Sequence, residues 1–143
     1  MAKAPPSTPN RPVDLPRSGG KRLLTGLGRA VRRKCPYCGG GGIFSGWFTL
    51  RERCPNCNTK YAHEDGYFIG SYVVNIGVTE ILTVLLVVWM LVATAMSVLE
   101  MQILGASLAI ALPVFFYPYA LLIWIAIDIT LHDPATRQQP RRR

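Results

Sequence analysis

The chain has 143 residues, half of them apolar, and a formal net charge of +8. Most of the Gly, Pro and charged residues precede position 67, whereas residues 67–131 are almost entirely apolar. A soluble domain interleaves the two kinds of residue along its chain. This division therefore argues against a single soluble domain and favours a membrane protein with a separate polar module.

The first twenty residues are rich in Pro and contain no long apolar run, so we expect a disordered tail over 1–20. This tail also lacks the apolar segment of a secretory signal peptide. We therefore expect the cysteines further along to stay inside the cell, where thiols are kept reduced. That expectation disfavours a pair of disulfides.

A basic segment follows at 21–34, with the sequence KRLLTGLGRAVRRK. Its apolar residues recur at helical spacing: Leu23, Leu24, Leu27 and Val31. An amphipathic helix here could lie on an anionic membrane surface, where each cation adds roughly 1 kcal/mol to binding. Two internal glycines weaken such a helix, so a flexible basic linker is the alternative.

Residues 35–66 are predicted to form a compact module around two Cys-Pro-x-Cys units, and the candidate ligands are Cys35, Cys38, Cys54 and Cys57. Two sulfurs three positions apart in a tight turn can point at one ion, and four thiolates suit tetrahedral Zn²⁺. Such a set leaves no open coordination position, which predicts a structural zinc ribbon rather than a catalytic site. Iron is the alternative, because rubredoxin-like sites use the same paired units.

The residues around the cysteines also favour a ribbon. Residues 43–53 (IFSGWFTLRER) have the aromatic and β-branched content of short strands. Gly39 and Asn58 each follow one cysteine pair, where a left-handed backbone is often required. Nearby cations would offset the charge of four thiolates, namely Arg33, Lys34, Arg53 and Lys60.

Residues 61–67 (YAHEDGY) are interpreted as the connection between the ribbon and the membrane. His63 and Glu64 within this segment leave open a second metal site or a general base. Near the far end of the apolar region, Asp128 is expected to reach water, and His132 and Asp133 are interpreted as ordinary cytoplasmic flanking residues.

Two apolar segments, at about 69–99 and 103–131, each exceed the roughly 20 residues needed to cross a bilayer. Residues 100–102 leave room for a short turn only, so the two spans must be antiparallel. The predicted fold class is a membrane all-α protein, in which a transmembrane hairpin within 67–133 carries a small N-terminal β zinc ribbon.

The placement of Lys and Arg predicts the orientation. Twelve of the sixteen precede the first span, four follow the second, and none lies between them. Positive flanks stay in the cytoplasm. We therefore expect the ribbon, both termini and a basic tail at 134–143 to be cytoplasmic.

One acidic residue, Glu80, falls inside the first span, roughly 16 Å from its start and so near the middle of the bilayer. A carboxylate there costs at least about 2.5 kcal/mol unless it is protonated or partnered. One hypothesis is that Glu80 is neutral or hydrogen-bonded to Tyr117 or Tyr119 of the second span. The alternatives are a bond within its own helix and contact with a partner protein. Glu80 lies beside a polar stripe formed by Ser71, Asn75, Thr79 and Thr83.

Over about residues 29–131, the chain resembles the bacterial domain-of-unknown-function 983 family of small membrane proteins. The resemblance rests on the order of a basic segment, Cys-Pro-x-Cys-Gly, the aromatic residues of 44–48, a second Cys-Pro-x-Cys, a His-Glu-Asp-Gly-Tyr run and a two-span hairpin. Asn58 stands where the family has Gly. The resemblance implies a bacterial inner-membrane location and supplies no activity.

Three functions follow as hypotheses. The first is a non-enzymatic interaction or scaffold protein of the inner membrane, whose helices pack with a membrane-protein partner or a second copy. Its contact surface would be Tyr37, Trp47 and Phe48, unless these aromatics form the ribbon's own core or rest on lipid. The second is a metal or redox accessory factor for assembly of a membrane complex, such as a respiratory one. The third, nucleic-acid binding by the basic ribbon, is disfavoured by the membrane tether. The sequence indicates no small-molecule substrate.

Overall fold

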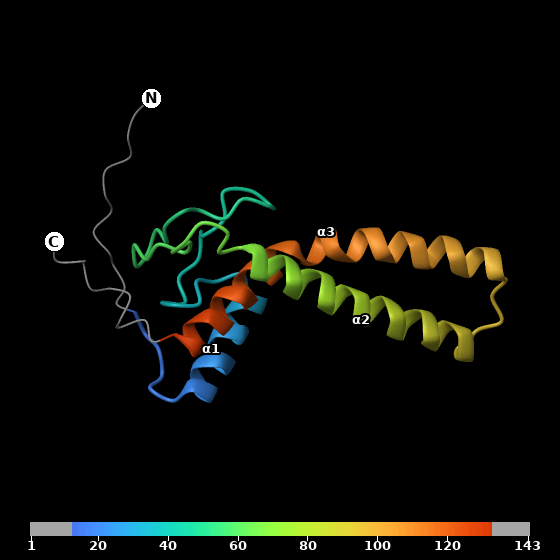
Figure 1. The fold of residues 1–143 in the computed structure, drawn as a ribbon, viewed down its shortest axis with the longest axis horizontal. Helices are drawn as coiled ribbons and strands as arrows, with labels where there is room; N and C mark the ends of the chain where they lie inside the picture. Colours follow the sequence, from blue (N-terminus) through green and yellow to red (C-terminus); the bar gives the residue numbers. More distant parts are fainter. Residues whose placement is uncertain (1–12, 133–143) are drawn as a thin grey trace, which may run out of the picture.

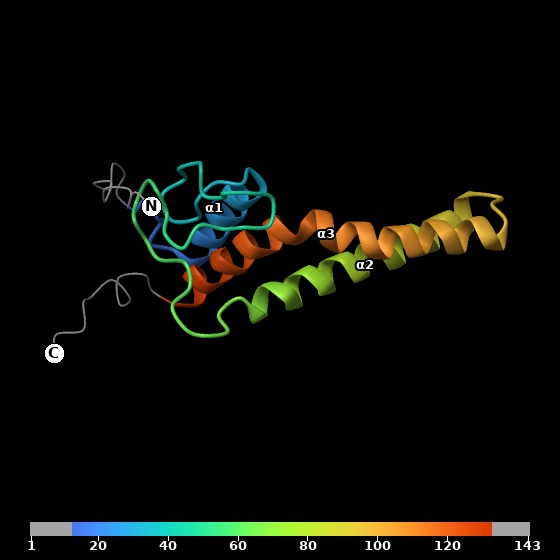
Figure 2. The ribbon, with the colours of Figure 1, turned by 90° about the horizontal axis from the view of Figure 1, so that it is seen from above.

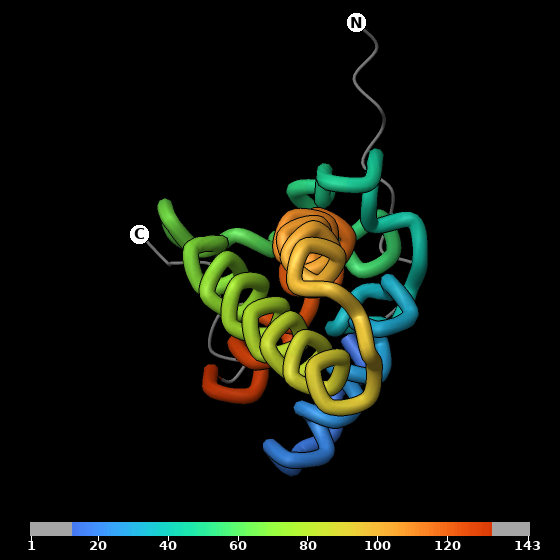
Figure 3. Tube along the Cα trace, turned by 90° about the vertical axis from the view of Figure 1, so that its right-hand side faces the viewer, coloured from blue at the N-terminus to red at the C-terminus, as the bar shows by residue number. Residues whose placement is uncertain are grey.

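The computed structural model describes residues 13–132, and three helices form its regular structure. Helix α1 spans Gly19–Val31, α2 spans Ile69–Ala93 and α3 spans Val98–Leu131. The last two form a long antiparallel hairpin, with α1 and the cysteine module at the end away from the turn (Figure 1). The view from above and the view along the hairpin show α1 and the module gathered around the C-terminal half of α3 (Figures 2 and 3).

The hairpin has an apolar surface that residues 13–132 leave uncovered. Both long helices are long and apolar enough to cross a membrane. A core helix of a soluble protein can meet the same criteria, but it is mostly buried. In α2 only 11% of the most apolar window is buried. This exposed apolar surface is what a bilayer would cover.

The turn between the long helices comes earlier than predicted, at residues 94–97 rather than 100–102. A capping box starts α3. The backbone N–H of Glu100 donates to Ser97 Oγ at 3.4 Å, and the backbone N–H of Ser97 donates to Glu100 Oε2 at 2.8 Å. Because this pair satisfies backbone donors at a helix start, Glu100 belongs to the first turn of α3 and not to the loop.

The polar stripe of α2 faces α3. Ser71, Asn75 and Thr79 are buried, and the side-chain amide of Asn75 donates to the backbone oxygen of Pro113 at 3.1 Å. The hydroxyl of Thr79 instead donates to the carbonyl of Asn75 in its own helix, at 2.7 Å. The stripe therefore sets the register of the hairpin while its polar groups stay largely satisfied within the apolar surroundings.

At Gly70 the side chain of Trp124 from α3 lies directly against the backbone of α2. A Cβ placed there would lie 2.3 Å from ring atoms of Trp124, whereas a Cβ at Gly77 would meet nothing within 4 Å. We expect Gly70→Ala to force the indole aside and lower the free energy of unfolding by about 1–3 kcal/mol. Gly77→Ala is the matched control, because it adds the same methyl group to the same helix at an open position.

Thermal unfolding of both variants in one detergent measures the difference. Gly77→Ala should be at least as stable as the parent, since Ala favours a helix over Gly by up to about 1 kcal/mol. Equal midpoints for the two variants would show that Trp124 is not held against α2.

Helix α1 packs on α3. A Cβ at Gly26 would lie 2.8 Å from the Cβ of Ala126, so the two helices touch through small residues. Of the two interpretations of residues 21–34, the structure shows a helix, and one face of it is occupied by α3. Leu24 and Val31 remain exposed on α1.

The predicted tail is ordered in the part that the structure describes. The backbone N–H of Asp14 donates to the carbonyl of Tyr37 at 3.1 Å, and Val13 and Leu15 pack against the core of the module. These apolar side chains add to a core that is otherwise very small. The prediction of a disordered tail is therefore wrong for the part of it that the structure describes. Residues 1–12 of the tail, together with Asp133 and the predicted basic tail at 134–143, lie outside the described residues.

Residues 35–66 have little regular structure. No strand occurs between residues 13 and 132, and the nearest equivalents are two isolated antiparallel bridges, Phe44 with Leu50 and Arg53 with Lys60. The cysteine turns occupy so much of this short module that few residues are left to pair as strands. The β ribbon therefore stays a prediction.

Candidate metal centre

The four cysteines converge on one point. Their Sγ atoms all lie within 4.8 Å of one another, and the sulfurs of Cys38 and Cys54 are 3.8 Å apart. Neighbouring sulfurs in a tetrahedral site with 2.3 Å bonds are about 3.8 Å apart, whereas those of a disulfide are about 2.05 Å apart. All four thiols are free, so the cluster has the spacing of a metal site and could hold an ion.

The same backbone turn is built twice around the cluster. The carbonyl of Cys35 accepts from the N–H of Gly39 at 2.8 Å, and its own N–H donates to the carbonyl of Gly40 at 2.8 Å. The equivalent bonds join Cys54 to Asn58 and to the residue after it, at 2.9 and 3.0 Å. Gly39 and Asn58 have φ angles of +70° and +58°, which confirms the predicted left-handed backbone at both positions.

Backbone donors point at the sulfurs from both turns. The N–H of Gly40 donates to the sulfur of Cys38, and the N–H of Asn56 donates to the sulfur of Cys54, each at 3.4 Å. The side-chain amide of Asn56 also donates to the carbonyl of Gly41 at 2.7 Å, and this bond connects the two turns. Such bonds stabilise thiolates and orient them toward a shared ion.

The metal-free cluster holds protons unevenly. Hydrogen bonding to Cys54 and then to Cys57, together with burial, raises the pKa of Cys35. Burial raises the pKa of Cys38 to about 11. The hydrogen bond from Cys35 lowers the pKa of Cys54, which therefore carries a thiolate. A metal ion that binds here has to displace the protons on Cys35 and Cys38.

Tyr61 closes the cluster from the side. It is 1% exposed, and its hydroxyl has no hydrogen bond of regular geometry among the described residues. Burial and the nearby sulfurs of Cys35 and Cys54 raise its pKa, so the hydroxyl keeps its proton beside the thiols. Sequence reasoning missed this residue. Its one signal was an aromatic residue four positions after the last cysteine.

We expect Tyr61→Phe to weaken metal binding by about tenfold, because the lost hydroxyl is positioned to donate to a thiolate of the bound state. Competition with a chromophoric chelator measures the affinity. Tyr72→Phe is a suitable control, since Tyr72 lies on α2 and is half exposed. Unchanged affinity in Tyr61→Phe would show that the hydroxyl only fills space.

Arg29 of α1 joins the helix to the first cysteine turn. One guanidinium nitrogen donates to the backbone oxygens of Asp14, Pro36 and Tyr37, at 2.9, 3.0 and 3.1 Å. The other nitrogen pairs with the carboxylate of Asp14 at 3.1 Å. Arg29 therefore fixes the cluster to the helical part of the protein, although its sequence position indicated only a basic surface.

The aromatic loop of the module reaches α3. The rings of Trp47 and Phe115 lie 5.6 Å apart, and those of Phe48 and Tyr117 lie 5.8 Å apart. The guanidinium of Arg33 stacks 4.6 Å from the Trp47 ring. Trp47 and Phe48 stay 39% and 54% exposed, so two of the three aromatic residues of the predicted contact surface are accessible, and the surface itself stays a prediction. Its third member, Tyr37, is buried in the core of the module.

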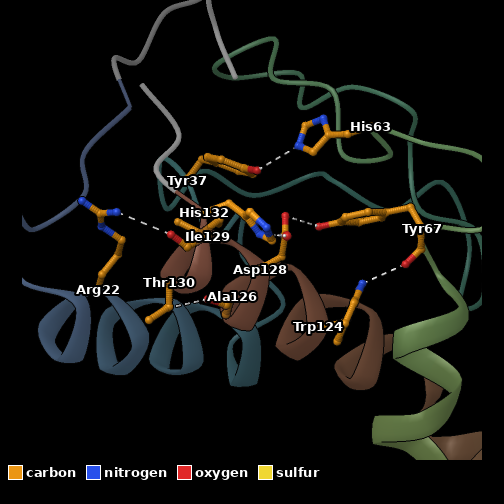
Figure 4. A network of polar contacts seen from close by, with 10 residues as sticks. All are labelled: Arg22, Tyr37, His63, Tyr67, Trp124, Ala126, Asp128, Ile129, Thr130 and His132. Atoms are coloured by element: carbon orange, nitrogen blue, oxygen red, sulfur yellow. Dashed lines mark hydrogen bonds and ion pairs between the residues drawn. The ribbon is translucent and has the colours of Figure 1, made fainter. Parts of the chain in front are cut away.

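A second polar group lies at the open end of the hairpin (Figure 4). Asp128 is buried, and its carboxylate accepts from the Tyr67 hydroxyl at 2.9 Å and contacts the His132 ring nitrogen at 3.0 Å. The indole N–H of Trp124 donates to the Tyr67 carbonyl at 2.8 Å. The expectation that Asp128 reaches water is therefore wrong, because Tyr67 and His132 cover it.

His63 and Glu64 do not make a second metal site. Within residues 13–132, only the four cysteines form a convergent group of three or more His, Cys, Asp or Glu side chains. The His63 ring nitrogen lies 3.4 Å from the Tyr37 hydroxyl, and Glu64 is exposed.

Glu80 makes no hydrogen bond with Tyr117 or Tyr119, whose hydroxyls were expected to donate to it. It is exposed, and it finds no hydrogen-bond or ion-pair partner in the described part of the chain. Tyr117 instead lies 6.1 Å from Tyr72, which is about 12 Å along α2 from Glu80, and Tyr119 stacks on Phe116. The pairing of Glu80 with these tyrosines was expected because the turn was placed too late in the chain. The earlier turn changes which residues of α2 and α3 lie opposite each other.

One family model, described as "Protein of unknown function (DUF983)", matches residues 44–129. The match covers the second cysteine pair, all of α2 and most of α3. Neither a curated protein nor a solved structure matches the chain.

Proposed function

We propose that this chain, which belongs to the DUF983 family, is a non-enzymatic membrane protein whose cysteine module is an interaction or scaffold module. The observation that carries the proposal is the closed four-sulfur cluster fixed to the end of an apolar hairpin. A shell of four sulfurs leaves no position for a substrate, so the metal serves structure. Zinc is the metal that such a shell favours, with iron as the alternative.

The metal completes the fold of the module in this proposal. The bridges of Phe44 with Leu50 and of Arg53 with Lys60 lie between and beside the cysteine turns, where short β-strands of a zinc ribbon would form. Binding energy at such a site becomes folding energy, which a module of this size needs.

We place the protein in a bacterial inner membrane, with the module and both chain ends in the cytoplasm. The positive flanks support this orientation, because all Lys and Arg residues lie outside the two apolar helices. The ends of the described chain and the module also lie together at one end of the hairpin (Figure 1).

The helices are proposed to pack with a partner membrane protein. Glu80 supports this, because an exposed carboxylate in a bilayer is costly without a partner. A second copy of the chain offers no cation for it, since no Lys or Arg occurs between Lys60 and Arg137. A partner that supplies a hydrogen-bond donor or a cation at this depth fits better.

Photo-crosslinking in intact membranes tests the proposal, with the crosslinker at position 47 in the exposed aromatic loop. The parent chain should hold one tightly bound zinc ion and give a defined crosslinked product. Cys35→Ser combined with Cys54→Ser should lose both and keep the hairpin in the membrane. Ser45→Ala, an exposed change in the same loop, is the control. A double cysteine variant that crosslinks like the parent would refute an interaction role for the module.

The second candidate is a metal or redox accessory factor, for example in assembly of a respiratory complex. One observation favours it: Cys57 is only partly buried, unlike the other three cysteines, so it is the most accessible member of the cluster. Metal analysis separates the two candidates. Zinc that resists mild oxidant supports the interaction module, and iron or easily lost metal supports the accessory factor.

A further inference from the structure

A cavity of about 320 Å³ lies at the open end of the hairpin. One wall is the segment that leads from the cysteine module into α2, and the other is the last turns of α3. This volume is within the usual range for small-ligand sites. Figure 4 shows the side chains of Tyr67, Trp124, Asp128 and His132 gathered at this place.

The lining of the cavity is acidic in a protein that is otherwise basic. Three acidic residues line it, namely Glu64, Asp65 and Asp128, and no Lys or Arg is among its lining residues. Two histidines, His63 and His132, line it as well, and His132 pairs with Asp128 at 3.0 Å. The whole chain, by contrast, carries a formal net charge of +8. The acidic residues of the lining therefore favour a cation in this cavity.

Two aromatic side chains, Tyr67 and Trp124, complete the wall. Their ring centroids lie 6.4 Å apart, and the indole N–H of Trp124 donates to the Tyr67 carbonyl at 2.8 Å. The Tyr67 hydroxyl donates in turn to buried Asp128 at 2.9 Å. These bonds hold the aromatic faces in place before any ligand arrives, and aromatic faces attract cations.

The position of the cavity indicates the source of the ligand. Tyr67 immediately precedes the start of α2, and Gly70 in the first turn of that helix also lines the cavity. If α2 crosses a bilayer, this level is the boundary between the hydrocarbon and the headgroups. Lipid headgroups are concentrated there.

We propose that this cavity binds a primary ammonium group at the membrane surface, as carried by ethanolamine phospholipids and by their soluble phosphoethanolamine esters. The exposed carboxylates of Glu64 and Asp65 can accept N–H donors of such a group, while the two aromatic rings offer a surface to its methylene carbons. A quaternary ammonium has no N–H to donate and suits this lining less well. The site is independent of the metal cluster and of the partner role proposed above.

Native mass spectrometry of the full chain tests the proposal. The protein is purified in detergent with equimolar phosphatidylethanolamine and phosphatidylglycerol, and the retained lipid is identified. We expect the ethanolamine lipid to be retained preferentially, although the net charge of the chain favours the anionic lipid. Glu64→Gln combined with Asp65→Asn should reduce that preference about tenfold, since both residues are exposed and the changes are nearly isosteric.

Glu52→Gln is the control, because Glu52 is exposed, acidic and not among the lining residues of the cavity. Calorimetric titration with soluble phosphoethanolamine distinguishes a lipid headgroup from a soluble ligand. Binding of the lipid alone or of both ligands supports a headgroup site, and binding of the ester alone supports a soluble ligand of the same chemistry. Equal retention of the two lipids without ester binding, equal binding of phosphocholine, or a cavity variant that behaves like Glu52→Gln would overturn the proposal.

Discussion

Replacing Cys54 by Ser should abolish metal binding and unfold residues 35–66, while α2 and α3 stay folded. Cys54 is 2% exposed, and it belongs to the same buried cluster as Ile43 and Tyr61. Structural zinc contributes about 10–16 kcal/mol of apparent binding energy to small modules at neutral pH. So short a segment has no other source of stabilisation that could replace a loss of that size.

Two measurements check this result. Metal content should fall from one ion per chain to none, and limited proteolysis should cut within the module. Helical circular dichroism should change little, because the hairpin contacts do not pass through the cysteines. Ser45→Ala should behave like the parent chain. A Cys54→Ser variant that keeps its metal and resists protease would show that the four sulfurs are not the ligands.

Lowering the pH by one unit, from 7.5 to 6.5, should weaken metal binding by at least about 100-fold. The pKa of Cys38 is raised to about 11, and the pKa of Cys35 is raised as well. Both groups therefore keep their protons at neutral pH in the metal-free cluster and lose them when the metal binds. Each displaced proton contributes a factor of ten per pH unit, so affinity rises with pH.

The other cysteines limit the size of the effect. The lowered pKa of Cys54 leaves it already ionised, so it adds nothing in this range. The dependence should weaken as the pH approaches about 11, where the Cys38 thiol also ionises in the metal-free state. Chelator competition at constant ionic strength, corrected for the chelator's own protonation, measures it. A tenfold change or less would mean that only one proton is displaced.

The parts of the fold that depend on neighbouring residues could be predicted from the sequence. Each cysteine turn is closed by bonds between residues four and five positions apart, and its left-handed positions are occupied by Gly39 and Asn58. The apolar length of the hairpin is equally local. The turn was predictable too, since Ser97 and Glu100 have the spacing of a capping box, but the apolar residues around them obscured it.

The parts that depend on distant residues could not be predicted. Tyr67 and Asp128 are 61 positions apart, and their hydrogen bond exists only because the hairpin returns α3 to the start of α2. The bonds of Arg29 to the first cysteine turn likewise depend on how α1 packs against α3. Single-sequence patterns carry the spacing along a helix but not the side on which another element will pack.

The unequal lengths of the two long helices leave the end of α3 free to hold another helix. Helix α3 has 34 residues and α2 has 25, so α3 extends about 13 Å further along its axis. That surplus is the part against which α1 packs, through the contact between Gly26 and Ala126. The last turns of α3 therefore support the polar half of the protein, and removing them would take away the surface against which α1 packs.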